Sequence, residues 1–519
     1  MRKRLLVTLI WIAACGANVS PTTVIPAPSA SAVSPPTTTS TTTDPEPSVV
    51  EKRITSADLL ADLAILREAY ETLHPGLYRY NSKEQMGTHF QMLAEEFRQD
   101  RTLVEAYLAI SIFLAKIKCG HTYANFYNQD KSVVEALFKH PDRLPFYFRW
   151  LRKRMIITRS FAENPALTPG TEVLAVDDVP VADILDRLMT ITRADGSNDA
   201  KRVSLLEVQG TDEWPTFDIF FSLFFPTKKA TRKLEIKNAQ SGTVSTLEVR
   251  ALSPDERFAP LKAAREAEKG DGPVWSIDYV DKQYALLRMR TFALYKSKWD
   301  WKGYLDQTFA DLEKRGVKNL ILDIRGNEGG LDVGEVLAQK HGGPNVRRSA
   351  YQRLVRYRKT PSALDKYLDT WDPSFKDWGD DAVPFKEGFF RLKDEPREKS
   401  VAKRAAFRGK TFVLIEATNS SAAFQFAQMV RENKLGRLVG SPTGGNQRGI
   451  NGGAFFFLRL PHSKIEVDLP LIGRFLDHEV PDAGIEPDVV VEPNIADIMA
   501  GRDSELEAVK KEISANQGR

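Results

Sequence analysis

Two adjacent serines, Ser420 and Ser421, lie where a chain can carry a nucleophile. Residues 411–417 read TFVLIEA, an apolar run of β-branched and aromatic residues that predicts a buried strand. From Ala422 the apolar residues recur at helical spacing. At such a junction, unpaired backbone N–H groups and the helix dipole favour a developing negative charge. The same position suits a plain helix cap, and on this stretch alone the structural role is favoured.

A glycine-rich segment follows a second apolar run. Residues 318–324 predict another buried strand, which continues into RGNEGG and ends at Gly329 and Gly330. Glycine lets the backbone approach a ligand closely, and its N–H groups can point at an anion. Phosphate is the alternative ligand, but the sequence has neither a Walker A pattern nor a GxGxxG run.

These segments together resemble a family of serine peptidases, which includes the tail-specific C-terminal processing proteases, tricorn protease and the interphotoreceptor retinoid-binding protein. LILDIRGNEGG (320–330) is similar to the family's LDLRNNxGG signature. SAAFQFA (421–427) is similar to its nucleophile segment S-A-A-E-x-F-A, and GSPTGG (440–445) to its G-x-x-T-x-G turn. With the closing GIEPD (484–488), the resemblance extends over most of the chain from about residue 56.

The resemblance implies that Ser421 is the nucleophile, and the sequence distinguishes two ways of activating it. Asn446 stands where the processing proteases have a lysine, and the nearby Arg448 does not release its proton. Residues 120–123, GHTY, match the histidine motif of the tricorn-like branch, so His121 is the expected general base. His74, in a His-Pro-Gly sequence, is the second histidine considered and is expected to be a turn residue.

The resemblance also implies a glutamate that orients the histidine and a pair of amides that hold the oxyanion. The nearest glutamate is Glu479, with Glu486 as the alternative. The amides expected are those of Ala422 and of either Gly329 or Gly330.

In the implied mechanism, Ser421 attacks an amide carbonyl while His121 takes its proton and later gives it to the leaving amine. One departure from the family is Phe424, which stands where the family has a glutamate. No metal-ligand spacing or nucleotide fingerprint occurs, so we expect no cofactor.

A multidomain α+β protein is expected to position these residues. Residues 55–142 predict a helical domain, and residues 272–500 an α/β catalytic core, crotonase/ClpP-like by resemblance. Between them, 143–255 contains PGTEVLAVDDVPVADIL, which resembles a PDZ domain and its peptide-binding groove; an unrelated small β-rich domain is the alternative. The insert 341–408 has no assigned role and could be a lid.

The N-terminus predicts export. Residues 1–15 have three cations, an apolar run and small residues before Cys15, as in a secretory signal with a lipobox, where the cysteine is lipidated. A soluble signal peptide with a chance cysteine is the alternative. Residues 16–54, rich in Ser, Thr and Pro, predict a disordered tether. The expected location is the cell envelope, on the periplasmic or extracellular face.

The leading hypothesis is therefore an exported, lipid-anchored serine endopeptidase acting on peptides or unfolded protein tails. The net charge of +4 gives no reason to expect a nucleic-acid partner. A different ester or amide substrate is one alternative. A catalytically inactive peptide- or ligand-binding protein on the same fold is the other.

Overall fold

The structure is a computed structural model that describes residues 53–267, 273–280, 282–347, 350–386, 388–393 and 407–515. The predicted signal peptide with Cys15, nearly all of the predicted tether and part of the insert 341–408 lie outside these ranges. Within them the chain has a mixed α+β fold with three six-stranded sheets and one two-stranded sheet. No helix of the described ranges has the length and apolar character needed to cross a bilayer.

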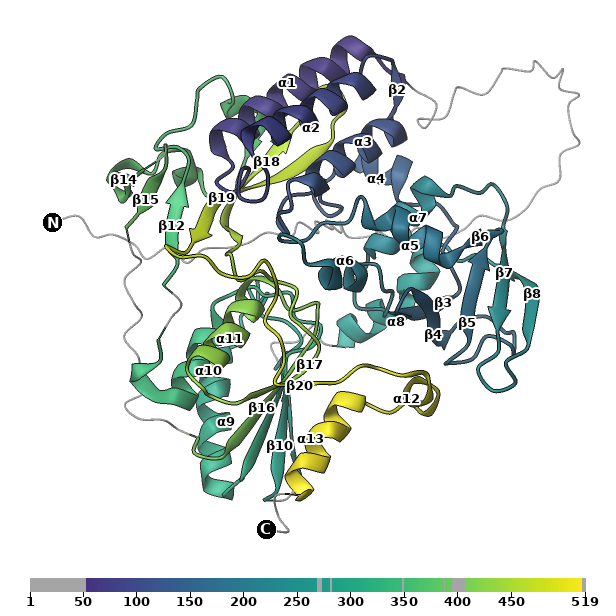
Figure 1. Cartoon of the computed structure of the whole chain (residues 1–519), viewed down its shortest axis with the longest axis vertical. Helices are drawn as coiled ribbons and strands as arrows, with labels where there is room; N and C mark the ends of the chain where they lie inside the picture. The colour runs from purple at the N-terminus through teal and green to yellow at the C-terminus, as the bar shows by residue number, and fades with distance from the viewer. Residues whose placement is uncertain are drawn as a thin grey trace, which may run out of the picture.

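Three helices open the described chain and lie together at the top of Figure 1: α1 (Ser56–Leu73), α2 (Lys83–Glu96) and α3 (Leu103–Lys116). The cap of α1 is Thr55, whose side chain accepts from the Asp58 amide. Helices α2 and α3 both begin with a capping box, so the polar residues before each apolar run fix where the helix starts. The apolar faces of these helices enter a common core.

That core is completed by a hairpin from the other end of the chain. β18 (Asn451–Arg459) and β19 (Glu466–Phe475) pair antiparallel beneath the three helices in Figure 1. The Tyr70 hydroxyl donates to the Asp468 carbonyl at 2.8 Å, and Asp62 accepts from the amides of His462 and Ser463 at 3.1 and 2.8 Å. The N-terminal helices and the hairpin are therefore one packed unit.

The insert that the sequence left without a role extends the hairpin sheet. Its strand order is β13-β18-β19-β12-β15-β14. The four added strands are β12 (Gln352–Val355), β13 (Leu368–Asp369), β14 (Ala382–Pro384) and β15 (Phe390–Leu392).

A second sheet forms the region on the right of Figure 1, with the order β3-β4-β5-β7-β8 and β6 paired to β5. Asp177 and Asp178 form the tight turn between β5 and β6, and both have positive φ, 49° and 67°. Its strands are β3 (Phe146–Leu151), β4 (Arg154–Ser160), β5 (Glu172–Val176), β6 (Val179–Pro180), β7 (Thr231–Lys237) and β8 (Val244–Arg250). The accompanying helices are α4 (Lys131–Leu137), α5 (Val181–Met189), α6 (Asp199–Leu205), α7 (Thr216–Phe224) and α8 (Pro254–Ala267).

The third sheet has the order β20-β17-β16-β11-β10-β9 and is parallel except for β9. Its strands are β9 (Ser276–Val280), β10 (Tyr284–Arg288), β11 (Asn319–Asp323), β16 (Lys410–Ile415), β17 (Arg437–Gly440) and β20 (Val489–Val490). Helices α9 (Trp301–Arg315), α10 (Val333–Gly342) and α11 (Ser421–Glu432) cover one face, and α13 (Ser504–Ala515) covers the other, after the short α12 (Ile495–Ala500). Because parallel strands end at the same edge, the loops after β10, β11 and β16 meet there.

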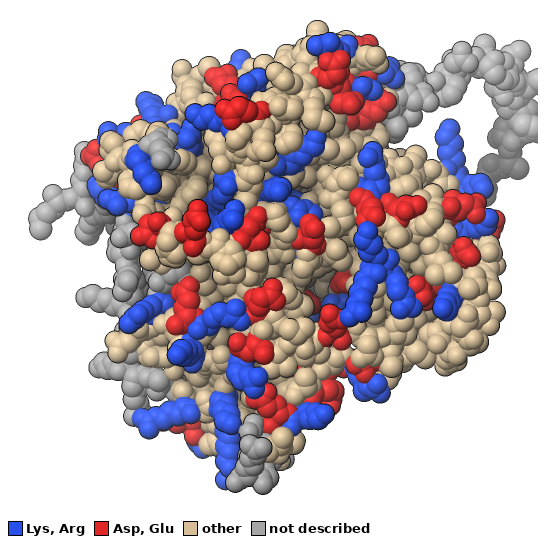
Figure 2. Space-filling model, in the orientation of Figure 1, with Lys and Arg blue, Asp and Glu red and all other residues tan. Residues whose placement is uncertain are grey.

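Charged side chains of both signs are interspersed over the face shown in Figure 2, in keeping with the small net charge of +4. The predicted domain boundaries stay predictions. The largest hydrophobic core runs without a break from the N-terminal helices into the second sheet and the β18–β19 hairpin; among its members are Leu59, Phe148, Leu185 and Phe456.

Candidate active site

A cavity of about 900 Å³ lies where the three regions meet. Ser421 and His121, which are 300 positions apart in the sequence, both line it. The glycine-rich loop after β11 lines the same cavity through Gly326, Gly329 and Gly330. The structure therefore brings the predicted nucleophile, base and oxyanion segment to one place.

Ser421 is the first residue of α11 and has a φ of +49°, which is unusual for a residue with a side chain. Ser420 precedes the helix in an extended conformation, and its hydroxyl donates to the Glu328 carbonyl at 3.2 Å. Its carbonyl accepts from Ala423 and Phe424 at 3.1 and 3.2 Å. Within the described part of the chain the Ala422 N–H makes no hydrogen bond, so it is available to an oxyanion.

The two candidate glycines differ in what their amides do. The Gly329 N–H donates to Asn327 Oδ1 at 2.9 Å, whereas that of Gly330 makes no hydrogen bond within the described ranges. A Cβ on Gly329, where φ is +105°, would lie 2.8 Å from both the Ala422 nitrogen and the Ser421 Cβ. Gly329 thus leaves space beside the nucleophile, and Gly330 is the better oxyanion donor.

Asn419 holds the loops of this site together, although sequence reasoning did not select it. The side chain is fully buried and donates to the carbonyls of Ile324 and Asn327 at 2.6 and 3.1 Å. Its carbonyl accepts from the amides of Gly444 and Gly445 at 2.8 and 3.1 Å. Through its side chain and its backbone carbonyl together, Asn419 joins the serine loop, the oxyanion loop and the GSPTGG turn.

Phe424, which replaces the family's glutamate, and Asn446, which stands where the processing proteases have a lysine, are both buried in the structure. Phe424 is 1% exposed, and its ring lies where a Cβ on Gly445 would fall, so it packs beneath the GSPTGG turn. Asn446 is fully buried and donates to the Asp482 carboxylate at 2.6 Å and to the Asp195 carbonyl at 3.2 Å.

His121 follows the end of α3 and is half-buried, with its ring 5.9 Å from that of Phe455. Burial lowers the pKa of His121 below its usual value, and the nearby cations Arg193 and Lys201 act in the same direction. The carboxylates of Asp195 and Glu328 oppose this shift. A neutral imidazole at physiological pH is the form that a general base requires.

His74 lies beside this segment and is the C-cap residue of α1, and its backbone N–H donates to the Tyr70 carbonyl at 3.1 Å. Its Nε2 is 2.9 Å from the Thr122 hydroxyl, and its Nδ1 accepts from the Gly76 amide at 3.1 Å. The ring stacks on Tyr70, and burial lowers the pKa of His74 to about 3.

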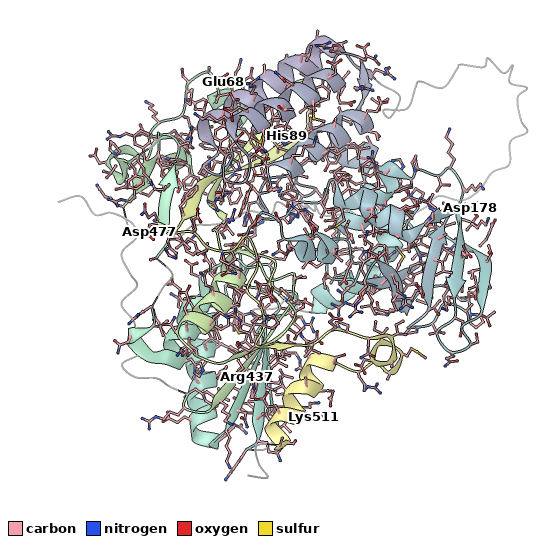
Figure 3. The ribbon with its side chains drawn as sticks, in the orientation of Figure 1. Glu68, His89, Asp178, Arg437, Asp477 and Lys511 are labelled. Carbon is pink, nitrogen blue, oxygen red and sulfur yellow. The ribbon has the colours of Figure 1, made fainter. Side chains whose placement is uncertain are left out.

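The structure does not bring Glu479 to the imidazole. Glu479 and Glu486 are both exposed, and neither lines the cavity. Asp477, two positions before Glu479, lies at the left edge of Figure 3 and pairs with its neighbour His478. Within the described ranges His121 Nδ1 is buried and has no hydrogen-bond partner.

Lys201 and Glu328 are cavity residues that sequence reasoning did not select. The Lys201 side chain is 5% exposed, and its Nζ lies 2.5 Å from Glu328 Oε1 and 2.9 Å from the Thr418 carbonyl. The Glu328 side chain is 45% exposed. Partial desolvation in the cavity raises its pKa, but the charges of Lys201 and Arg193 outweigh this effect and lower the pKa to about 2. Glu328 belongs to the RGNEGG segment, so the sequence offered a motif from which its place at the site could be inferred. Lys201 stands in no such motif.

The comparisons with known proteins agree with this geometry. The model of Peptidase family S41 matches residues 283–491, which include the oxyanion loop, Ser421 and the GSPTGG turn but not His121. Among curated proteins no sequence matches the chain.

Solved structures of CPAF share the fold. Mature CPAF is 14% identical, with 89% of this chain and 99% of that chain covered and a TM-score of 0.56. Mature CPAF complexed with lactacystin is 15% identical, with coverages of 88% and 98% and a TM-score of 0.55. The model of peptidase family S41 spans the serine helix and both loops that surround its first residue, and this match supports a serine-type peptidase.

Proposed function

We propose that this protein is a serine endopeptidase that hydrolyses peptide bonds of peptides or unfolded protein tails. Ser421 is the nucleophile and His121 the general base, and the amides of Ala422 and Gly330 hold the oxyanion. The observation that carries the proposal is the shared cavity, to which segments 300 positions apart contribute the serine and the histidine.

Each step follows from the side chains that line the cavity. His121 takes the hydroxyl proton as Ser421 Oγ attacks the carbonyl carbon, and the oxygen that becomes negative accepts from the two free amides. The protonated imidazole then gives its proton to the leaving amine, which breaks the C–N bond and leaves an acyl-serine. Water, deprotonated by His121, releases the acid and restores the serine.

The size of the cavity supports an extended substrate. At about 900 Å³ it is as large as the larger pockets that proteins use for small ligands, and it is lined from three regions. A disordered peptide segment can enter such a site without unfolding first, whereas a folded domain cannot.

The proposal includes export and attachment to a membrane through a lipid on Cys15, which rests on residues 1–15. The tether would let the enzyme body reach as far as roughly 100 Å from the bilayer, at about 3.1 Å per extended residue. In an expressing bacterium, Cys15→Ser is expected to move the protein from the membrane fraction to the soluble exported fraction.

The test of catalysis uses the described body without residues 1–52. Unfolded substrate proteins should be cleaved by the wild type, and cleavage should fall by at least about a thousandfold in Ser421→Ala and His121→Ala. A fluorophosphonate probe should label Ser421, read by fragment masses that separate it from Ser420. Unchanged cleavage in both variants would refute the assignment. A wild type that neither cleaves nor labels would instead favour the binding protein.

A further inference from the structure

One short segment of the second region contacts both halves of the active site. Arg193 donates through Nε to the Gly120 carbonyl at 2.9 Å, and Asp195 Oδ1 accepts from the Gly120 amide at 2.9 Å. The Gly196 amide donates to the Lys118 carbonyl at 2.9 Å. The loop that carries His121 is therefore fixed from outside its own helical region.

The same segment reaches the serine side. Asn198 donates to the carbonyls of Thr443 and Gly445 at 2.9 and 2.8 Å, and Lys201 holds the Thr418 carbonyl and Glu328. Residues 193–201 thus set the separation of the histidine loop and the serine loop.

Within this segment Asp195 has the properties that a partner of His121 needs. It lines the cavity and is 2% exposed, so solvent screens its charge little. Its bond to the Gly120 amide places the carboxylate beside the residue that precedes His121. The other charged groups with the largest effects on the imidazole are Arg193, Glu328 and Lys201.

We infer that Asp195 is the positioning residue of His121 and takes the part that the family resemblance gives to Glu479. Its carboxylate fixes the histidine loop through the Gly120 amide. Its negative charge stabilises the imidazolium that forms when Ser421 loses its proton. The inference rests on the proposed function.

The balance of charges around the imidazole supports this role. Among the groups that raise the pKa of His121 against the effect of burial, the Asp195 carboxylate is the strongest and Glu328 is weaker. Glu328 is itself paired with Lys201 at 2.5 Å, so much of its field is cancelled. Asp195 is thus the main source of stabilisation for a positive charge on His121.

The test compares Asp195→Asn with Asp199→Asn. The first change keeps an oxygen that can accept from Gly120 and removes only the charge. The second removes the same charge from the same segment at a side chain that is 75% exposed. For Asp195→Asn we expect kcat to fall by about tenfold or more, because a loss of 1.4 kcal/mol in the transition state corresponds to tenfold. KM should change little.

The pH profile separates an electrostatic role from a merely structural one. Without the Asp195 charge the pKa of His121 falls further, so the acidic limb of kcat/KM should move to lower pH. In Asp199→Asn and in the charge-preserving Asp195→Glu, the acidic limb of kcat/KM should stay at its wild-type pH. An unmoved limb in Asp195→Asn would overturn the inference.

A second measurement needs no catalysis. In the Ser421→Ala background, the His121 imidazole is titrated by NMR of histidine-labelled protein, with His121→Gln to assign its signal. Adding Asp195→Asn should shift the midpoint to lower pH, and adding Asp199→Asn should not. An unshifted midpoint contradicts the role of Asp195. If the midpoint shifts in this background although the wild type shows no peptidase activity, the electrostatic pairing is supported and the proposed function is refuted.

Discussion

At the scale of single residues, burial shifts the pKa of one carboxyl group at the wall of the active-site cavity. Asp468 is 2% exposed and accepts from Asn125 and Asn128 at 2.7 and 3.0 Å. Burial raises the pKa of Asp468 to about 7, even though both hydrogen bonds favour the ionised form. This carboxyl group therefore titrates near neutral pH, at the wall of the active-site cavity.

Asp468 should make stability fall as the pH rises. Between about pH 4 and pH 7 the folded protein holds a proton at Asp468 that the unfolded chain has released, so the free energy of unfolding decreases through this window. The penalty above pH 7 reaches at most about 4 kcal/mol, at 1.36 kcal/mol for each pH unit. Asp468→Asn removes this titration. The thermal midpoint of the variant minus that of the wild type should therefore be more positive at pH 8 than at pH 5.

The matched control is Asp178→Asn, at the exposed turn labelled on the right of Figure 3. The change in thermal midpoint that Asp178→Asn causes should be the same at pH 5 and at pH 8. If the Asp468→Asn difference is also independent of pH, Asp468 does not titrate in this window.

Residue roles were predictable where a local pattern carries them. Ser421 and His121 stand in short motifs, and the structure places both in one cavity. Glu479 is predicted only from its position before GIEPD, and a position in the sequence does not specify that a side chain turns inward. Asp195 and Lys201 had no local signal, because their contacts depend on pairs of residues 75 and more positions apart.

At the scale of elements, the site depends on how closely the oxyanion loop approaches the start of α11. Gly329→Ala places a methyl group 2.8 Å from both the Ser421 Cβ and the Ala422 nitrogen. Neither contact involves the flexible end of a side chain, so the loop must move away. We expect peptidase activity and fluorophosphonate labelling to fall by at least about a hundredfold, the cost of losing one oxyanion donor.

Gly316→Ala is the control for backbone strain. Gly316 ends α9 with a φ of +65°, and a Cβ there meets nothing within 4 Å. Its cost should be about 1 kcal/mol of stability, with labelling of Ser421 unchanged. Equal labelling of the two variants would show that the loop is not held against the serine.

Elements with strong periodicity were predictable, and short strands were not. The apolar runs of β11 and β16 and the amphipathic pattern of α11 appear in the sequence. The strands of the insert have two to four residues and pair with partners such as β19, about a hundred positions away. Such strands are fixed by the edge that they join rather than by their own residues.

At the scale of the whole molecule, α1 and the β18–β19 hairpin depend on each other. Asp62 is fully buried and accepts from two backbone amides of the hairpin turn. Asp62→Ala leaves these donors without partners, which should cost roughly 2–4 kcal/mol. The thermal midpoint should fall, and labelling of Ser421 should fall with it at temperatures where the hairpin loosens.

Glu68→Ala serves as the comparison, because Glu68 lies exposed on the same helix, as Figure 3 shows. It should leave the midpoint within about 0.5 kcal/mol of wild type. If the two variants have the same midpoint, the Asp62 contacts do not stabilise the protein.

The order of regions along the chain was predictable, but their joint packing was not. Composition and periodicity separate helical, β-rich and α/β stretches. They cannot show that a hairpin near residue 460 completes a core begun at residue 59. The hydrophobic effect is non-directional, so the pattern of apolar residues does not specify which segments pack together.

The β18–β19 hairpin also determines the stage of synthesis at which the active site can first form. A ribosome makes the histidine loop early, but that loop rests on a core whose last strands are translated more than 300 residues later. A nascent chain therefore holds its nucleophile and base in unconnected pieces, and a chain interrupted before β19 should be inert. Because β18 and β19 are translated late, the active site can assemble only when synthesis of the chain is nearly complete.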